Sequence, residues 1–325
     1  MAKKKTKIFF ATDVHGSEVV FKKFLNAGKV YKVDVLILGG DLTGKMIVPL
    51  VKQPDGSYVG KLYGTTYVAK TEEELNRVEG IIKSSGYYPY RTTPEEVEEL
   101  RANKEKLEEL FKKVALDTLR YWTELAEERL KGTGITLYMC GGNDDIPEVS
   151  EILKEAEERT NGLIVNPDER VVYIDDIHEM ASISYSNMTP WKCPRDVPEE
   201  KLKEIIEEVV SQINDYSNAI FNFHVPPYGT MLDIAPELDE ELRPKVELGG
   251  GMKMTNVGSK AVREAIEKYQ PLLGLHGHIH EAKATQKLGR TLCINPGSEY
   301  GEGVLRGSYI YIGDKKVIAH MFTSG

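Results

Sequence analysis

The sequence predicts a layered α/β protein, and three observations support that prediction. Short runs of apolar residues recur along the chain, and each has the length of a strand that is buried on both faces. Amphipathic helical patterns lie between these runs, so strand and helix alternate as they do in α/β architectures. Each run also ends in a cluster of polar residues, and open α/β folds place their ligands at that end of the strand.

These elements follow in a regular order on both sides of one long interruption. Five predicted strands occupy residues 8–11, 33–38, 135–140, 219–223 and 272–275. Four predicted helices occupy residues 16–28, 147–160, 199–217 and 257–269. Two later β runs, 308–312 and 316–322, flank Gly313-Asp314 and should pair antiparallel. We therefore expect mixed sheets.

The interval 45–134 interrupts this alternation, and we interpret it as an insertion within a single domain that spans 1–325. It should begin with a hairpin over 47–69 that turns at Pro54-Asp55-Gly56-Ser57. Because the hairpin leaves directly from the loop of Asp41, we expect it to lie near the strand-end site. A smaller insertion is expected at about 160–215.

Helices should complete the first insertion. Thr71 and Glu74 form a capping-box pattern, which predicts a helix that begins at Thr71. A single longer helix should begin at Pro94, because proline is well tolerated in the first turn of a helix. Its apolar face continues to Trp122.

Composition and charge narrow the possible functions. The chain is 41% hydrophobic and 29% charged, which is typical of a globular protein. Its formal net charge of −9 argues against broad nucleic-acid or membrane binding, because phosphate surfaces attract Lys and Arg. The one dense basic run is Lys3-Lys4-Lys5 with Lys7, at the N-terminal end. A small phosphorylated substrate remains compatible, because bound metal ions dominate the local field of a site.

The compartment is predicted from cysteines and apolar stretches. Cys140, Cys193 and Cys293 are few, odd in number and far apart, so a disulfide framework is not expected. The apolar stretch after the N-terminal lysines is too short for a secretory signal, and no stretch approaches the length that spans a bilayer. We therefore expect a cytoplasmic protein. Scarce glutamine beside abundant Lys and Glu fits a heat-adapted protein.

Polar residues at the ends of the predicted strands indicate a metal site. The set consists of Asp13, His15, Asp41, Asn143, His224, His278 and His280. Carboxylates, imidazoles and a carboxamide bind ions such as Mn, Fe, Co, Ni or Zn. Seven ligands are too many for one catalytic ion with open positions, but they suffice for two ions that share a carboxylate, and two such ions clamp a phosphoryl group. A chance gathering of polar loop residues is the simpler alternative, but so many ligand types at strand ends seldom coincide.

Five motifs together carry a resemblance to a known family. They are Asp13-x-His15, Gly40-Asp41, Gly142-Asn143-Asp144-Asp145, His224 and Gly277-His278-Ile279-His280. In this order they resemble the calcineurin-like metallophosphoesterase superfamily, and they span residues 13 to 280. The resemblance implies a four-layer αββα sandwich with a two-metal centre on one edge. It does not cover the inserted segments.

The resemblance also implies the ligands of each ion and the reaction. Asp13, His15, Asp41 and His280 would hold one ion. Asp41, Asn143, His224 and His278 would hold the other, with Asp41 bridging. In this family a metal-bridging hydroxide attacks phosphorus in line with the leaving group. We expect two divalent ions, with Mn favoured and Fe, Co, Ni or Zn as alternatives.

One position departs from the pattern of many family members. They carry a histidine after the motif asparagine, where it contacts the phosphate and assists the leaving group, whereas this chain has Asp144. A carboxylate has no proton to donate, so the sequence is closer to branches without that histidine, which include phosphodiesterases. If Asp144 faces the phosphate, it should repel a monoester dianion more than a diester monoanion. Alternatively, Asp144 points away, or Asp144-Asp145 caps the helix expected near Pro147. We take Asn143 and Asp144 as candidate catalytic residues.

Three further residues are weaker candidates. His276 shares strand parity with His278 and His280, so it is a candidate for substrate binding, with packing beneath the site as the alternative. Tyr228 follows Pro226-Pro227 and either contacts substrate or packs on that turn. Trp191 either rims the pocket or anchors a loop.

The sequence thus favours a metal-dependent phosphodiesterase with a small phosphorylated substrate. Its rivals are a catalytically weak protein-binding scaffold of the same fold, a phosphomonoesterase or nucleotide pyrophosphatase, and a nuclease. Nucleic acid is disfavoured by charge, whereas a protein partner or homo-oligomer is compatible with the sequence. Because histidines bind metal only when neutral, activity should fall at acid pH.

Overall fold

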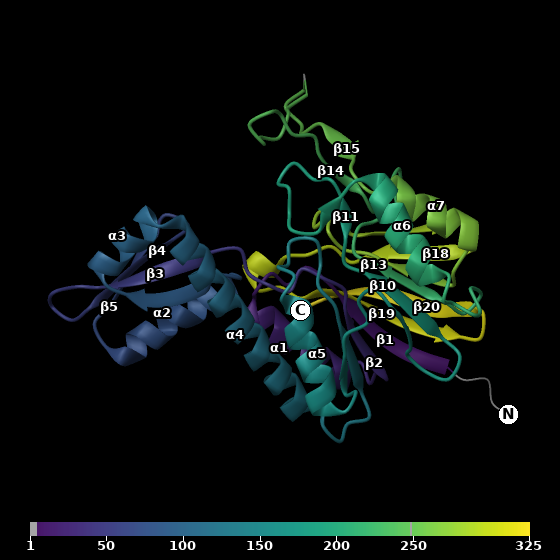
Figure 1. Cartoon of the computed structure of the whole chain (residues 1–325), viewed down its shortest axis with the longest axis horizontal. Helices are drawn as coiled ribbons and strands as arrows, with labels where there is room; N and C mark the ends of the chain where they lie inside the picture. The colour runs from purple at the N-terminus through teal and green to yellow at the C-terminus, as the bar shows by residue number, and fades with distance from the viewer. Residues whose placement is uncertain (1–4, 248) are drawn as a thin grey trace.

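The structure, a computed structural model, describes residues 5–247 and 249–325. Residues 1–4, which include Lys3 and Lys4 of the basic run, and Leu248 lie outside the described residues. Two six-stranded sheets form the centre of the molecule, and a lobe and a thin arm extend from it (Figure 1).

The first sheet has the strand order β20-β19-β1-β2-β7-β8. Its strands are β1 (Lys5–Ala11), β2 (Val35–Leu38), β7 (Thr136–Met139), β8 (Ile164–Val165), β19 (Arg306–Gly313) and β20 (Lys316–Ser324). β1, β2, β7 and β8 are parallel, whereas β19 is antiparallel to both β1 and β20. The predicted mixed sheet and the antiparallel pair at 308–322 are therefore confirmed.

The second sheet has the order β17-β18-β16-β13-β10-β9. Its strands are β9 (Val171–Tyr173), β10 (Glu179–Ile183), β13 (Ile220–Phe223), β16 (Leu273–Leu275), β17 (Ala284–Leu288) and β18 (Thr291–Asn295). The four inner strands are parallel, and β9 and β17 pair antiparallel at the two edges.

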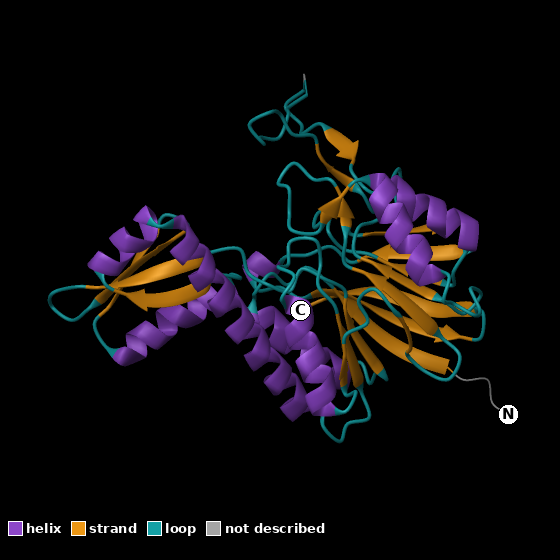
Figure 2. Ribbon diagram, in the orientation of Figure 1, coloured by secondary structure: helices purple, strands orange, loops and turns teal. Residues whose placement is uncertain are grey.

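Helices cover the outer face of each sheet (Figure 2), which gives the predicted four layers. The first sheet is covered by α1 (Glu18–Val30), α4 (Lys104–Leu130) and α5 (Val149–Thr160), and the second by α6 (Glu199–Val210) and α7 (Lys260–Tyr269). α6 is shorter than the predicted 199–217. The chain turns away after Val210, and Asn214 N then donates to Glu179 Oε2 at 3.0 Å.

Alternation along β1 explains why its sequence is apolar throughout. Ile8 and Phe10 face the core between the two sheets, whereas Phe9 and Ala11 face the helical layer. A strand between two apolar layers needs apolar side chains at every position. The chain can turn polar only where the strand ends, which is where Asp13 follows β1.

The inserted interval forms a lobe with its own small core. Four strands lie in the order β5-β4-β3-β6. The lobe contains β3 (Ile47–Lys52), β4 (Tyr58–Leu62), β5 (Thr65–Ala69), α2 (Glu72–Ser84), β6 (Tyr88–Thr92) and α3 (Pro94–Ala102). The expected hairpin is β3–β4, and the capping box of Thr71 and Glu74 is present at the start of α2. Leu50, Leu75 and Val78 are among the residues that pack at its centre.

Two expectations about this interval were wrong. The single long helix from Pro94 is two helices, because the side chain of Asn103 accepts a hydrogen bond from Lys106 N and caps a new helix, α4. The hairpin does not lie beside the strand-end site, because β3–β5 stand out in the lobe (Figure 1). The segment that leads into β3, the turn before β6 and Phe111 of α4 reach the site.

The interval 160–215, expected as a smaller insertion, supplies strands to both sheets. β8 lies at the edge of the first sheet, and β9 and β10 lie in the second. The remaining short elements are β11 (Ser186–Asn187), β12 (Asp196–Val197), β14 (Ile234–Pro236), β15 (Met254–Asn256) and a 3₁₀ turn at Tyr300–Glu302. Among the described residues, no helix combines the length and apolar character that crossing a membrane requires.

Candidate metal centre

Parallel strands bring the predicted ligands to one edge of the sandwich. β1, β2 and β7 are neighbours in one sheet, and β13 and β16 are neighbours in the other. Because parallel strands end at the same edge, the loops that follow them meet there. His15 N donates to Asp41 O at 2.9 Å and Gly277 N donates to His224 O at 2.9 Å, so these loops are also joined by backbone hydrogen bonds.

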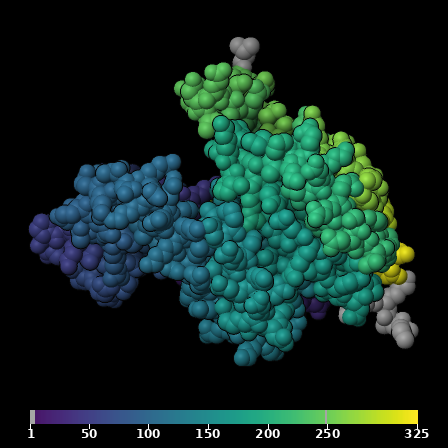
Figure 3. All heavy atoms as spheres, in the orientation of Figure 1, coloured from purple at the N-terminus to yellow at the C-terminus, as the bar shows by residue number. Residues whose placement is uncertain are grey.

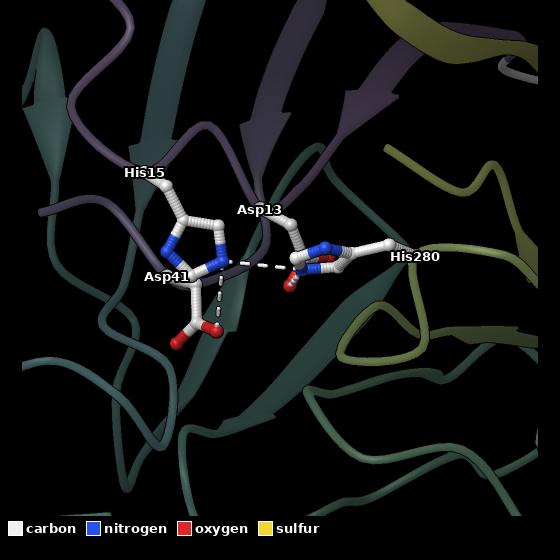
Figure 4. Close-up of side chains that lie close together, drawn as sticks. All are labelled: Asp13, His15, Asp41 and His280. Atoms are coloured by element: carbon white, nitrogen blue, oxygen red, sulfur yellow. Dashed lines mark hydrogen bonds and ion pairs between the residues drawn. The ribbon is translucent and has the colours of Figure 1, made fainter. Parts of the chain in front are cut away.

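Four ligands form a compact group (Figure 4). Each of Asp13, His15, Asp41 and His280 offers one ligand atom, and these atoms lie within 4.8 Å of one another. Nε2 of His15 lies 3.1 Å from Nε2 of His280 and 3.4 Å from Oδ2 of Asp41. Two imidazole nitrogens that face each other beside carboxylates suit a cation that accepts both lone pairs.

The other three predicted ligands extend this group. His224 Nε2 lies 3.4 Å from Asp41 Oδ2, so Asp41 is shared between the two sets of ligands. His278 Nδ1 lies 2.8 Å from Asn143 Oδ1. Asn143 Nδ2 donates to Asp196 Oδ1 at 2.9 Å, which turns the amide oxygen of Asn143 toward His278. All seven predicted ligands therefore meet at this edge.

Unpartnered nitrogen atoms support binding of a metal. His224 Nδ1 lies 3.1 Å from the carbonyl oxygen of Gly39, so in the neutral, metal-binding imidazole Nδ1 carries the proton and Nε2 offers its lone pair. His224 Nε2 is buried and has no hydrogen-bond partner among the described residues. A backbone carbonyl that fixes the tautomer in this way is typical of metal-binding histidines. The donor set therefore fits divalent ions.

The electrostatics of the group also favour added positive charge. Burial alone would lower the pKa of His224, but the carboxylate of Asp41 raises it to about 9. Burial likewise opposes ionisation of Asp13, yet the neighbouring histidines, His280 foremost, hold its pKa below the usual range. Carboxylates that draw a proton onto a buried imidazole also attract a metal cation.

The backbone at the site is strained. Asp13, His15, Asp41 and His278 have φ values of 53°, 39°, 50° and 66°, in the left-handed region that non-glycine residues rarely adopt. Such conformations cost on the order of 1–3 kcal/mol each and persist only where surrounding contacts impose them. The strain turns these side chains out of the strand direction and toward one another.

Glycines beside the ligands allow this close approach. A Cβ atom on Gly142 would lie 2.2 Å from Asp41 Oδ1, and one on Gly277 would lie 2.4 Å from Asp13 Oδ2. A Cβ atom on Gly40 would lie 2.3 Å from His224 Nδ1. The glycine in each motif therefore makes room for a ligand that another motif supplies.

Comparisons with known proteins agree with this architecture. No family model matches the chain. The uncharacterized protein MJ1162 of Methanocaldococcus jannaschii is 32% identical over 145 residues, which are 44% of this chain. The chain spans 58% of that relative's length.

Two solved structures align over 99% of this chain and 99% of their own, with TM-scores of 0.58 and 0.55 at 15% and 14% identity. The second is TT1561 of Thermus thermophilus. A structure described as a novel archaeal phosphodiesterase aligns with a TM-score of 0.40 at 12% identity, which is too remote to bear on this chain's activity.

The chain has the fold of the calcineurin-like metallophosphoesterases. The two central sheets, the helical layers and the gathering of five motifs on one edge agree with it. Asp144, where the sequence departs from the metallophosphoesterase pattern, lies close to the metal ligands. Asp144 lines a pocket beside the metal ligands, and its Oδ2 lies 3.9 Å from Nδ1 of His15 and 3.1 Å from Nζ of Lys45.

Asp144 therefore neither points away nor caps the helix near Pro147. The helix α5 begins at Val149, and its N-cap residue, Glu148, makes no side-chain capping bond. Asp145 instead stabilises the loop that carries Asp41. It accepts hydrogen bonds from Leu42 N, Thr43 N and Gly142 N at 2.8–2.9 Å.

Lys45 was missed in the sequence. Its ammonium group pairs with Asp144, and its loop is held by Tyr88, whose hydroxyl accepts a hydrogen bond from Gly44 N at 2.7 Å. A lysine in the loop after a metal-binding aspartate was a usable signal. The contact between Asp196 and Asn143 could not be predicted, because no sequence signal links two residues that lie 53 positions apart.

The two predicted substrate-binding residues lie outside the pocket lining. His276 is fully buried, with Nδ1 2.8 Å from Phe223 O, because the chain turns out of β16 and breaks the strand parity. Tyr228 packs beside Lys260, whose Nζ lies 5.5 Å from the ring centre. Trp191, in contrast, lines the pocket with 63% of its surface exposed, so it is no loop anchor.

Proposed function

We propose that this chain is a metal-dependent phosphoesterase that hydrolyses a phosphodiester. The observation that carries the proposal is the convergence of seven ligand side chains, including an unpartnered and buried His224 Nε2, beside an open pocket. Hydrogen-bonded structural clusters leave no such lone pairs pointing at a shared point.

The residues divide into two ligand sets that share Asp41. Asp13, His15, Asp41 and His280 would hold one divalent ion, and Asp41, Asn143, His224 and His278 the other. Mn is favoured for this set of oxygen and nitrogen donors, and Fe, Co, Ni or Zn are alternatives. When bound, two such ions supply an activated water nucleophile and neutralise charge on the phosphoryl group.

The chain's own residues orient the substrate and adjust its charge environment. Asp196 fixes the amide of Asn143, and Tyr88 fixes the loop that carries Lys45. Lys45 attracts a phosphate oxygen and also offsets the charge of Asp144. Asp144 therefore repels a phosphate dianion less than an isolated carboxylate would.

Space and charge at the site support a diester as the substrate. The pocket has a volume of about 1020 Å³ and opens directly from Asn143, His278 and His280, so a second ester group can enter it. A diester carries one negative charge, which a single Lys45–Asp144 pair tolerates more readily than two. The net charge of −9 does not favour a nucleic-acid substrate.

A metal-titration and turnover experiment tests the proposal. Metal-stripped protein should bind about two Mn ions by calorimetry, the count that two ligand sets require. It should then hydrolyse bis(p-nitrophenyl) phosphate faster than p-nitrophenyl phosphate. Asp41→Ala removes the shared ligand and should lower kcat/KM by about a thousandfold. Asp117→Ala, an exposed aspartate on α4, is the matched control and should leave turnover unchanged.

Each contrary result selects a different function. Folded protein that binds Mn but turns over neither ester would point to the scaffold of the same fold. A clear preference for the monoester, or for a pyrophosphate bond, would replace the diester with those substrates. Turnover that persists without any divalent ion would overturn the metal-dependent reaction.

A further inference from the structure

The pocket beside the metal ligands has two chemically different ends. At one end it is lined by Asp41, Asn143, His278 and His280. At the other end its walls come from residues 187–194 and from the chain before and after the β14–β15 arm. In the space-filling view the arm and the lobe stand out from the body with an indentation between them (Figure 3).

The far end of the pocket is mainly apolar. Met188, Pro190 and Trp191 come from one segment of its lining, and Leu238, Pro244 and Val257 come from the chain around the arm. Met188 is 51% exposed and Trp191 is 63% exposed. Large apolar side chains that remain this accessible inside a pocket of ligand size are typical of surfaces that bind an apolar group.

The loop that carries Trp191 is held in place before any ligand arrives. The loop folds around the carboxylate of Asp196, which accepts hydrogen bonds from Thr189 N at 3.1 Å and Cys193 N at 2.9 Å. The same carboxylate fixes Asn143 at 2.9 Å, so the loop of Trp191 and a metal ligand share one support. A loop whose backbone is already fixed loses less conformational entropy when a ligand binds to it.

The charges of the pocket exclude a second phosphate. Among the described residues that line it, Lys45 is the one Lys or Arg side chain, and it already pairs with Asp144. Asp239 and Glu281 add negative charge along the walls. A polyphosphate or a nucleic-acid backbone needs several cations along its path, whereas an uncharged organic group needs none.

We propose that the pocket selects phosphodiesters whose second ester group is a flat, uncharged aromatic group that packs against Trp191. This inference rests on the proposed phosphoesterase and names its substrate class. Stacking on a tryptophan face suits an aromatic ring, and the other apolar residues of the lining add apolar surface for it to contact. The phosphate then lies at the end of the pocket that carries Lys45 and the metal ligands.

Two diesters with the same leaving group test the inference. In methyl p-nitrophenyl phosphate and 1-naphthyl p-nitrophenyl phosphate, water attacks phosphorus, the P–O bond to p-nitrophenolate breaks, and only the retained ester group differs. The metal-loaded wild type should show a kcat/KM about tenfold higher for the naphthyl ester. Trp191→Ala should bring the two values together, chiefly by lowering the value for the naphthyl ester. Tyr173→Ala, an equally exposed aromatic outside the pocket lining, should keep the wild-type ratio.

A binding measurement separates this inference from the proposed activity. Calorimetry with methyl (1-naphthylmethyl)phosphonate, whose naphthyl group is attached through a P–C bond and whose methoxide is a poor leaving group, should show binding that weakens about tenfold in Trp191→Ala. If neither diester is hydrolysed but this dependence is seen, the activity fails and the pocket assignment stands. If both diesters are hydrolysed equally in the wild type, or the ratio survives Trp191→Ala, the assignment is overturned. Preferred cleavage of a dinucleoside polyphosphate would also overturn it.

Discussion

The two ends of the sandwich carry the same residue types and use them in opposite ways. At the end where β1 begins, Asp175 accepts hydrogen bonds from His178 Nδ1 at 2.7 Å and from the backbone N of Ile177 and His178 at 2.9 Å, and Thr6 also donates to it. At the end where β1 finishes, His15 Nε2 faces His280 Nε2, and His224 Nε2 has no hydrogen-bond partner among the described residues, with Asp41 Oδ2 3.4 Å away.

This comparison shows how a structural cluster of Asp and His differs from a functional one. Around Asp175 every partner is a donor and every lone pair is used, so the cluster stabilises the fold by itself. At the metal end the nitrogen lone pairs converge on one another, which is unfavourable unless a cation joins them. The satisfaction of hydrogen bonds, rather than residue type or burial, distinguishes the two ends.

The largest expected effect comes from closing the space at the metal end. In Gly142→Ala the new Cβ would lie 2.2 Å from Asp41 Oδ1, so the shared ligand must move. We expect a loss of at least about a hundredfold in kcat/KM, since a displacement of about 1 Å has effects of this size, together with weaker Mn binding by calorimetry. Gly249→Ala, which meets open space, is the control. Full activity in Gly142→Ala would show that the two ligand sets do not depend on this close approach.

A smaller effect should come from the charge pair at the pocket. Lys45→Ala leaves the charge of Asp144 uncompensated, so the ratio of diester to monoester kcat/KM should rise by about tenfold, because the monoester dianion is repelled more. Asp144→Asn should shift the ratio in the opposite direction. Turnover of the two aryl esters by each variant provides the measurement. A ratio that moves the same way in both variants would exclude this electrostatic account.

The smallest effect should come from the paired end. Burial alone would raise the pKa of Asp175, but hydrogen bonds from His178 and Thr6 hold it below the usual range. A depressed folded pKa means that Asp175 contributes stability above the unfolded value of about 4 and loses it as the pH falls further. Asp175→Asn should therefore lower the free energy of unfolding by about 1–2 kcal/mol at pH 7 and by less at pH 3. Urea unfolding at both pH values measures this, and an equal loss at both would remove Asp175 from acid sensitivity.

The sequence was sufficient for the parts of the molecule that local chemistry determines. Strands buried on both faces must be apolar, and polar residues follow their ends, so a layered α/β fold and the gathering of the seven polar residues could be predicted from local patterns. The four-layer sandwich was implied by the resemblance of the five motifs to a known family. The cap at Asn103 was also local, but an apolar face that runs from Val97 to Trp122 hid the break between α3 and α4. The prediction that His276 binds substrate was wrong, because the alternation of side chains along β16 ends at Leu275, where the strand ends.

The pocket could not be predicted in the same way. Its lining joins the Lys45 loop, the start of α4, residues 187–194 and the base of the β14–β15 arm, which are distant in sequence. The polar contacts that organise the pocket, such as that between Asp196 and Asn143, join residues that are distant in sequence and show no local sequence pattern. Loops of this kind acquire their positions only when the fold is complete.

The helix α4 connects the lobe to the body of the molecule. Its 27 residues make a rod of about 40 Å. The C-terminal half of α4 packs in the outer helical layer, where the rings of Trp122 and Phe21 stack with their centroids 4.3 Å apart. The N-terminal half extends to the lobe (Figure 1). A second contact between the body and the lobe is a hydrogen bond that Ser17 Oγ donates to Ser84 O at 2.8 Å. The lobe is thus attached to the body both through α4 and through the loop of Ser17, which lies two residues after His15.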